Sequence, residues 1–196
     1  KSRSRGLGDV YKRQESNLGL SAPELAEALT VADVVCPTVT DALNSEVFAA
    51  AAEVGIRAKL LANFGVGFNH IDLAAAAAHG LVVSNTPGVL TDATAEIAMT
   101  LLLMCARRTS EGERLVRGEQ WQGWHPTHML STQVSGKTLG IVGMGRIGIA
   151  MARMAHHGFA MRIVYSSRSA VAESVAMELG AQCLPLDELL QTTDFV

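Results

Sequence analysis

The chain has 196 residues, of which 48% are hydrophobic and 18% are charged, and its formal net charge is −3. This balance excludes the strong positive field that attracts nucleic acid or an anionic membrane surface, and the longest apolar run, residues 97–106, is too short to span a bilayer. The three well-separated cysteines form no C-x-x-C pair, so we expect a cytoplasmic protein without a metal site, in which Cys36, Cys105 and Cys183 are small core residues.

Residues 1–14 differ in character from the rest of the chain. They are basic and almost free of apolar periodicity. We interpret them as a foreign or disordered segment, similar to translated adapter or vector sequence, and exclude them from fold reasoning. A basic arm that binds nucleic acid is the alternative interpretation.

Short helices and strands alternate between residues 15 and 90. The helices are expected to begin at the capping-box pattern Ser21-Ala-Pro-Glu24, at Ser45 and after Asp72, with Gly55 and Gly80 ending the second and third. The strands are expected at residues 33–36, 58–62 and 81–83, the first of them buried. This alternation at short spacing predicts a parallel, doubly wound sheet.

A glycine-rich turn, residues 63–69, follows the second of these strands and precedes a helix. In a parallel sheet such a turn lies at the carboxyl ends of the strands, where ligands bind. Gly65 and Gly67 would allow successive backbone N–H groups to point inward as an anion nest, which suits a small carboxylate substrate. An ordinary glycine turn is the alternative.

The segment from Asp92 to Arg108 is predicted to form one helix, capped by Thr91 or Asp92. Apolar residues cover nearly its whole circumference, which indicates burial on both sides. We expect it between two domains or at a subunit interface and favour burial in a homodimer; packing inside one domain is the alternative. The polar segment from Gly118 to Ser135 is expected to wrap as a loop over the sheet edge.

The clearest chemical signal is a glycine fingerprint, G-x-G-x-x-G, at residues 143–148. An apolar strand, residues 138–142, precedes it, a helical pattern over residues 149–157 follows, and a second strand is expected at residues 162–165. This order of strand, fingerprint and helix predicts a dinucleotide site, with the pyrophosphate on free N–H groups at the helix N-terminus. A purely structural turn is the alternative.

The residues after the second strand indicate which dinucleotide binds. Sites for NAD usually place an acid there to hold the ribose 2′-hydroxyl, whereas this chain has Ser166-Ser167-Arg168-Ser169. A guanidinium and hydroxyl groups would bind a 2′-phosphate by charge-assisted hydrogen bonds. We therefore expect NADP(H) as the preferred cofactor, with NAD(H) as the alternative in which Arg168 is a solvated surface charge.

Four blocks in fixed order carry a family resemblance: residues 65–73, 85–96, 118–124 and 136–148. From about Ser21 to Val196 the chain resembles the D-isomer-specific 2-hydroxyacid dehydrogenases, and within them it is most similar to the glyoxylate/hydroxypyruvate reductase branch.

The resemblance implies an α/β fold in two parts. Residues 15–90 would form a partial flavodoxin-like substrate domain, and residues 91–196 the first half of a Rossmann doubly wound nucleotide-binding domain, including an interdomain helix over residues 92–108. It also implies hydride transfer between NADPH and a small 2-keto or 2-hydroxy acid such as glyoxylate or hydroxypyruvate, and a homodimer for the full-length protein.

The resemblance assigns roles to particular residues. Val66 and Gly67 would offer backbone N–H groups to the substrate carboxylate, and Thr94 would contact the cofactor near its nicotinamide end. The other cofactor-binding residues it implies are Gly143, Met144, Gly145, Arg146, Ile147 and Gly148 at the pyrophosphate, and Ser167, Arg168 and Ser169 at the 2′ side.

The family's catalytic arginine, glutamate and histidine come later than Val196, so we expect no dehydrogenase activity from these 196 residues alone. The histidines present are not substitutes. We expect structural or solvated roles for all six: His70, His79, His125, His128, His156 and His157.

Two other functions remain open at this point. Within the family, the alternative is a phosphoglycerate or formate dehydrogenase relative. Outside enzymes, the alternative is a non-catalytic module for nucleotide binding or dimerisation.

Overall fold

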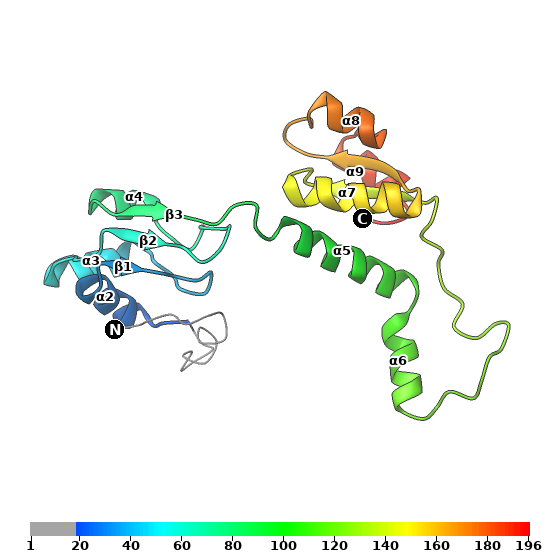
Figure 1. Ribbon diagram of the computed structural model, residues 1–196, viewed down its shortest axis with the longest axis horizontal. Coiled ribbons are helices and arrows are strands. Elements are labelled where there is room, and N and C mark those ends of the chain that lie inside the picture. Colours follow the sequence, from blue (N-terminus) through cyan, green and yellow to red (C-terminus); the bar gives the residue numbers. More distant parts are fainter. Residues whose placement is uncertain (1–18) are drawn as a thin grey trace. The chain divides into compact units, whose positions relative to one another are not determined.

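The computed structural model describes residues 19–196, so the segment 1–14 that we interpret as foreign lies outside the described residues. The chain divides between Pro87 and Gly88 into two compact units (Figure 1). Each unit holds a parallel sheet of three strands with helices packed on it. The prediction of an α/β fold with parallel sheets is therefore confirmed.

The first unit alternates helices and strands as expected. Its sheet has the order β1-β2-β3, with Val34 paired to Leu60 and Leu60 paired to Val82. Its elements are α2 (Ala22–Val31), β1 (Val34–Val35), α3 (Ser45–Val54), β2 (Leu60–Ala62), α4 (Leu73–Ala78) and β3 (Val82–Ser84).

Side chains and glycines end these helices where the sequence indicates. The Glu24 carboxylate accepts a hydrogen bond from the Ser21 N–H at 2.8 Å, which is the returning half of the capping box. Asp72 accepts from the Ala75 N–H at 2.9 Å and begins α4. Gly55 ends α3 with a φ of +111°, a conformation that L side chains rarely adopt.

The prediction that the first strand is buried is wrong. β1 is an edge strand of two residues, and 48% of Val34 is exposed. The apolar core of this unit lies instead between the helices and the central strand, around Leu29, Phe48 and Leu61. An edge strand pairs on one side only, so its side chains have fewer neighbours to cover them.

The prediction of three core cysteines is also wrong, since Cys36, Cys105 and Cys183 are all exposed. Cys36 follows the edge strand β1 and Cys183 lies on the edge strand β6 (Gln182–Cys183). Cys105 lies near the end of helix α5 (Thr91–Ala106), on a side that the second unit leaves exposed. The three side chains are therefore surface thiols.

The second unit builds its sheet in the order β4-β5-β6. Its other elements are α5 (Thr91–Ala106), α6 (Thr109–Arg117), β4 (Thr138–Val142), α7 (Arg146–Phe159), β5 (Arg162–Ser166), α8 (Glu173–Leu179) and α9 (Leu186–Thr192). Leu139 pairs in parallel with Ile163 on one side and Phe195 on the other. The strand order therefore reverses at β4, which is the topology of the first half of a Rossmann sheet.

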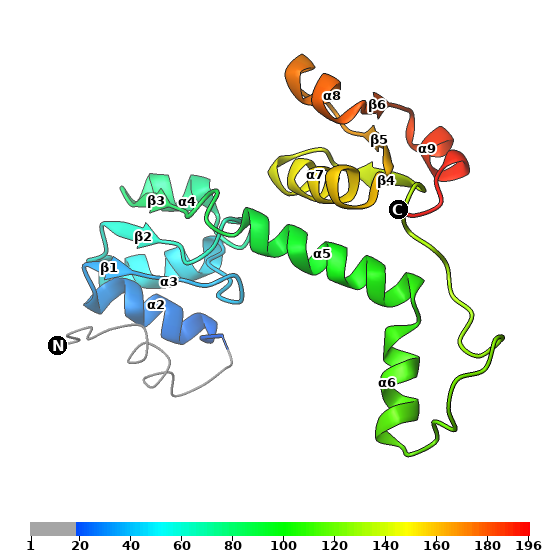
Figure 2. The ribbon, with the colours of Figure 1, turned by 45° about the vertical axis from the view of Figure 1, so that its right-hand side comes forward.

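The long apolar helix, α5, differs from its prediction at its first turn. Leu90 occupies the N-cap position without a side-chain hydrogen bond, so neither Thr91 nor Asp92 caps the helix. Helix α5 lies beside α7 (Figures 1 and 2), and on this side Ala95 and Met99 join the core of the second unit. Burial of its other side between two domains or in a homodimer stays a prediction. The opposite side leaves Ile97 60% and Leu101 55% exposed within this chain.

The helix also ends earlier than predicted, because Arg108 adopts a φ of +53° and starts a separate helix, α6. The segment from Gly118 to Ser135 has no regular structure, but the prediction that it covers the sheet edge is wrong. It is held against the end of α5: the Thr132 N–H donates to the Ala106 carbonyl at 2.9 Å and Arg108 Nη1 to the Leu130 carbonyl at 3.1 Å.

An ion pair on the surface of this unit joins α7 to α8. Two nitrogens of the Arg153 guanidinium, Nε and Nη2, each donate to the Glu178 carboxylate at 2.8 Å, and His157 Nε2 lies 3.6 Å from that carboxylate. The hydrogen bonds from Arg153 lower the pKa of Glu178 to about 2, from an ordinary value of 4.5.

We expect the Glu178→Gln chain to lose part of its acid sensitivity. A lowered folded-state pKa stabilises the fold above the unfolded pKa, and this stabilisation disappears as pH falls from about 4.5 toward 2. The thermal unfolding midpoint should therefore fall less steeply over this range in Glu178→Gln than in the unsubstituted chain. Identical slopes in a pH series of melting curves would contradict this role for the pair.

Candidate functional site

The fingerprint turn and the serine–arginine segment lie at one edge of the second sheet. Val142 and Ser166 are the last paired residues of β4 and β5, and the Gly143 N–H donates to the Ser166 carbonyl at 2.8 Å. Residues 143–148 and 167–169 therefore leave neighbouring strands at their carboxyl ends. Phe195 pairs on the other side of β4, so this is also where the strand order reverses, the usual ligand site of open α/β sheets.

The three fingerprint glycines meet three different requirements. Gly143 has a φ of +97°, which the tight turn out of β4 needs. A Cβ on Gly148 would overlap the carbonyl oxygen of Gly143, so helix and strand approach closely only without a side chain there. A Cβ on Gly145 would meet no atom within 4 Å, which leaves open space over the turn. The open space and the bare backbone fit the approach of a phosphate group.

The backbone N–H groups of this turn are available to a ligand. Within residues 19–196, no acceptor is found for the N–H groups from Met144 to Gly148, and no side chain caps α7. Gly145 occupies the N-cap position of this helix of 14 residues, so the free donors add to the positive end of its dipole. Unpaired N–H groups at a helix N-terminus form an anion site.

The predicted cofactor-binding residues differ in how exposed their side chains are and in the hydrogen bonds they make. The Met144 side chain is buried in the core, so only its backbone faces the turn, whereas Arg146 is exposed and 38% of Ile147 is exposed. Thr94 lies in the first turn of α5, and its hydroxyl donates to the Leu90 carbonyl at 2.8 Å. No hydrogen bond joins Thr94 to the fingerprint turn in the part of the chain that the structure describes.

The segment after β5 presents a cation without an acid. Arg168 is exposed and makes no ion pair with any described residue. The Ser167 hydroxyl donates to the Ser169 carbonyl, and the buried Tyr165 hydroxyl accepts from the Val171 N–H at 3.2 Å. The segment is thus tied at both ends while its guanidinium stays available.

A second candidate site lies in the first unit, at the turn after β2. The Asn63 N–H donates to the Ser84 carbonyl at 2.9 Å, which places the turn beside the carboxyl end of β3. Neither Gly65 nor Gly67 has a positive φ, so these glycines do not serve the turn by backbone strain. Among the described residues no acceptor is found for the N–H groups of Val66 and Gly67, and a Cβ on Gly67 would meet nothing within 4 Å.

Side chains that the sequence did not single out hold this turn. Asn63 Nδ2 donates to the carbonyls of Gly65 and Gly67, at 3.1 and 2.9 Å, and Asn85 Nδ2 donates to the Val66 carbonyl at 2.8 Å. Asn63 directly follows β2 and Asn85 directly follows the neighbouring strand β3. That position at the carboxyl ends of a parallel sheet is the signal that could have identified them.

The histidines take structural or surface positions, as expected. Their contacts are His70 Nε2 with Asn63 Oδ1 at 2.9 Å, His156 Nδ1 with the Met161 carbonyl at 3.0 Å, His157 with Glu178, His79 stacked on Phe48, and His125 edge-on to His128.

A metal site and a membrane span are two further features that the described residues could contain. No group of three His, Cys, Asp or Glu side chains within residues 19–196 is arranged to hold a metal ion. Over the same residues, no helix combines the length and apolarity needed to cross a membrane.

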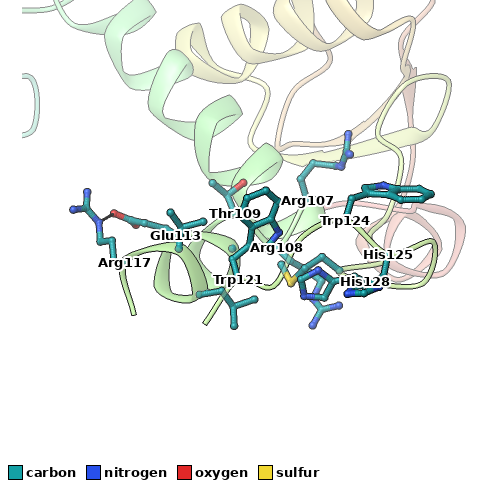
Figure 3. Close-up of a pocket in the computed structure, with 13 residues that line it drawn as sticks. Arg107, Arg108, Thr109, Glu113, Arg117, Trp121, Trp124, His125 and His128 are labelled. Atoms are coloured by element: carbon teal, nitrogen blue, oxygen red, sulfur yellow. Dashed lines mark hydrogen bonds and ion pairs between the residues drawn. The ribbon is translucent and has the colours of Figure 1, made fainter. Parts of the chain in front are cut away.

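A pocket of about 760 Å³ lies between α6 and the irregular segment that follows it. Figure 3 shows Trp121 and Trp124 on its wall with His125, His128 and Arg108. None of the predicted substrate or cofactor residues lines this pocket. It is therefore separate from the two candidate sites at the strand ends.

Comparison with known proteins gives consistent results. Residues 99–196 match the family model described as D-isomer specific 2-hydroxyacid dehydrogenase, NAD binding domain. The chain is 45% identical over 181 residues to a glyoxylate reductase of Thermococcus onnurineus, covering 90% of this chain and 52% of that protein. It is 42% identical over 198 residues to a glyoxylate reductase of Korarchaeum cryptofilum, covering 98% and 58%.

Among solved structures, a putative D-isomer specific 2-hydroxyacid dehydrogenase, NAD-binding, from Polaromonas sp. JS6 66 is 38% identical with a TM-score of 0.81, covering 96% of this chain and 59% of that one. The chain thus spans between half and three-fifths of the length of the proteins it matches.

Proposed function

The chain belongs to the D-isomer-specific 2-hydroxyacid dehydrogenase family. We propose that it forms the nucleotide-binding turn and the carboxylate-binding loop of an NAD(P)-dependent oxidoreductase. The observation that carries this proposal is the run of N–H groups from Met144 to Gly148 that no described residue accepts from, at the edge where the sheet reverses its strand order. Fixed donors of this kind suit a diphosphate.

The residues present fit a nicotinamide dinucleotide. In the proposed complex the N–H groups of Gly145, Arg146 and Ile147 hold the pyrophosphate, and Thr94 contacts the cofactor near its nicotinamide end. The proposal includes a preference for NADP(H), with Ser167, Arg168 and Ser169 at the 2′-phosphate, since a free guanidinium and no acid follow β5.

The substrate in this proposal is a small 2-keto acid such as glyoxylate or hydroxypyruvate. The N–H groups of Val66 and Gly67 hold its carboxylate. When bound, the reduced nicotinamide supplies the hydride for the keto carbon. Glyoxylate is the first choice because the two relatives named above are glyoxylate reductases.

We expect the 196-residue chain to bind its ligands without turning them over. The resemblance assigns the family's catalytic arginine, glutamate and histidine to none of these 196 residues, and in the proposed reaction those groups polarise the carbonyl and donate the proton. Calorimetric titration with NADPH and an assay of NADPH oxidation by glyoxylate, made on the same sample, test both statements. Saturable binding without turnover is the expected result; turnover would contradict the second statement, and absence of binding would contradict the proposed function.

A homodimer is the assembly we propose for the complete protein. The face of α5 that carries Ile97 and Leu101 is apolar and exposed within one chain, and a second copy would cover it. Sedimentation velocity of the unsubstituted and Leu101→Glu proteins tests this arrangement.

We also propose a reducing, cytoplasmic location, in keeping with three unpaired thiols.

A further inference from the structure

Asn63 is a buried polar residue whose side-chain hydrogen bonds all go to residues of the turn after β2 or to His70. Only 2% of the residue is exposed. Its Nδ2 group donates to the carbonyls of Gly65 and Gly67, and its Oδ1 atom lies 2.9 Å from His70 Nε2. Because Oδ1 can only accept, His70 carries a proton on Nε2 and donates it. The imidazole therefore fixes which way the carboxamide points.

A second carboxamide completes the arrangement from the neighbouring strand end. Asn85, beyond β3, donates from Nδ2 to the Val66 carbonyl at 2.8 Å, and the Thr86 N–H donates to the Gly65 carbonyl at 3.1 Å. Three successive carbonyl groups, those of residues 65–67, therefore accept hydrogen bonds from donors within the first unit.

Holding these carbonyls also fixes the direction of the N–H groups between them. The N–H of Val66 belongs to the same planar peptide as the Gly65 carbonyl, and the N–H of Gly67 to the same peptide as the Val66 carbonyl. No cis peptide bond is found in the described chain, so in each of these trans peptides the N–H points opposite to the held C=O. A rotated peptide would instead present a carbonyl oxygen to an approaching anion.

We propose that Asn63 and Asn85 are positioning residues that aim the Val66 and Gly67 N–H groups at the substrate carboxylate, with His70 fixing the orientation of Asn63. This inference rests on the proposed function, which places a carboxylate at those two N–H groups. Donors oriented before the ligand arrives need no reorganisation when it binds, so their contribution to affinity is retained.

The test is an amide-resolved NMR titration of the chain with oxamate, a stable analogue of a small 2-keto acid. The variants are Asn63→Ala and Asn85→Ala, and the matched control is Asn69→Ala, which removes an exposed carboxamide in the same turn without a hydrogen bond to a described residue. All three changes leave the charge unaltered. We expect oxamate to shift the Val66 and Gly67 amide signals, with binding about tenfold weaker in the two variants and within about twofold of the unsubstituted chain in the control.

Measuring both the oxamate affinity and the unfolding midpoint separates a role in positioning the N–H groups from a role in stabilising the fold. Removing a buried carboxamide at residue 63 is expected to lower the unfolding midpoint, so Asn85→Ala, at a half-buried position, decides the matter if Asn63→Ala does not fold. A lower midpoint with unchanged oxamate affinity in the folded variants would overturn the positioning role alone. If oxamate leaves the Val66 and Gly67 signals of the unsubstituted chain unmoved, the carboxylate site of the proposed function is wrong and the positioning role falls with it.

Discussion

Replacing Gly148 by alanine is expected to lower the free energy of unfolding of the second unit by about 1–3 kcal/mol, the usual cost of forcing extra volume into a close contact. The new Cβ would overlap the Gly143 carbonyl oxygen and lie 3.2 Å from Ile141 Cγ2. Both are strand or turn atoms, so α7 would have to move away from β4. The same movement would disturb the turn around Gly145, and we expect nucleotide affinity to fall as well.

Gly158→Ala is the matched control on the same helix. A Cβ there would meet no atom within 4 Å, and residue 158 is exposed with an ordinary helical φ. Alanine in a helix interior is favoured over glycine by about 0.8–1 kcal/mol. Gly158 lies in the last turn of α7, so this substitution should stabilise the unit by part of that amount and leave nucleotide binding unchanged. Urea denaturation of both variants measures the contrast. If both substitutions stabilise the chain, the packing role of Gly148 is wrong.

Replacing Arg168 by alanine is expected to weaken NADPH binding about tenfold to a hundredfold and to leave NADH binding nearly unchanged. A hydrogen bond to a charged group contributes about 1.5–3 kcal/mol, and only NADPH carries the 2′-phosphate that would receive it. Arg168 is exposed and makes no ion pair among the described side chains, so its loss should not disturb the fold.

Calorimetric dissociation constants for both nucleotides, on both chains, measure this effect, and NADH serves as the internal control. An equal loss for the two nucleotides would mean that Arg168 acts on something other than the 2′-phosphate. NADH binding as tightly as NADPH in the unsubstituted chain would assign NAD(H) as the cofactor and return Arg168 to the role of a solvated charge.

The sequence predicted the centre of the second unit well. The strand at residues 138–142 is observed with the same bounds, and β5 is one residue longer than predicted. Helix α7 begins three residues earlier than its apolar pattern, because its first turn is formed by fingerprint residues, which carry no apolar periodicity. Turn chemistry and buried strands are local properties, so a sequence pattern records them.

The exposure of a side chain depends on how many strands and helices pack against its element, and a local sequence pattern does not record that number. The residues of β1 are as apolar as those of a central strand, and only its place at the sheet edge exposes Val34. Helix α6 follows a break at Arg108 and has no buried residue. Leu115 and Val116 are its only large apolar residues, too few to show a helical repeat in the sequence.

The candidate carboxylate turn was located from its glycines, whereas the side chains that shape it were not found. Asn63 and Asn85 are 22 positions apart in the sequence and meet because β2 and β3 are parallel neighbours. Their partners are backbone carbonyls, which leave no residue pattern. Strand pairing had to be known before the two carboxamides could be related to one turn.

In the proposed function, the N–H groups around Gly145, unpaired within residues 19–196, hold a diphosphate. The most direct measurement is an amide-resolved NMR titration of this chain with NADPH and, separately, with NADH. Saturable shifts concentrated in residues 143–148, accompanied by shifts in residues 167–169 that are larger with NADPH, are the predicted result. Signals of residues 143–148 that stay in place at high concentrations of both nucleotides would contradict the claim.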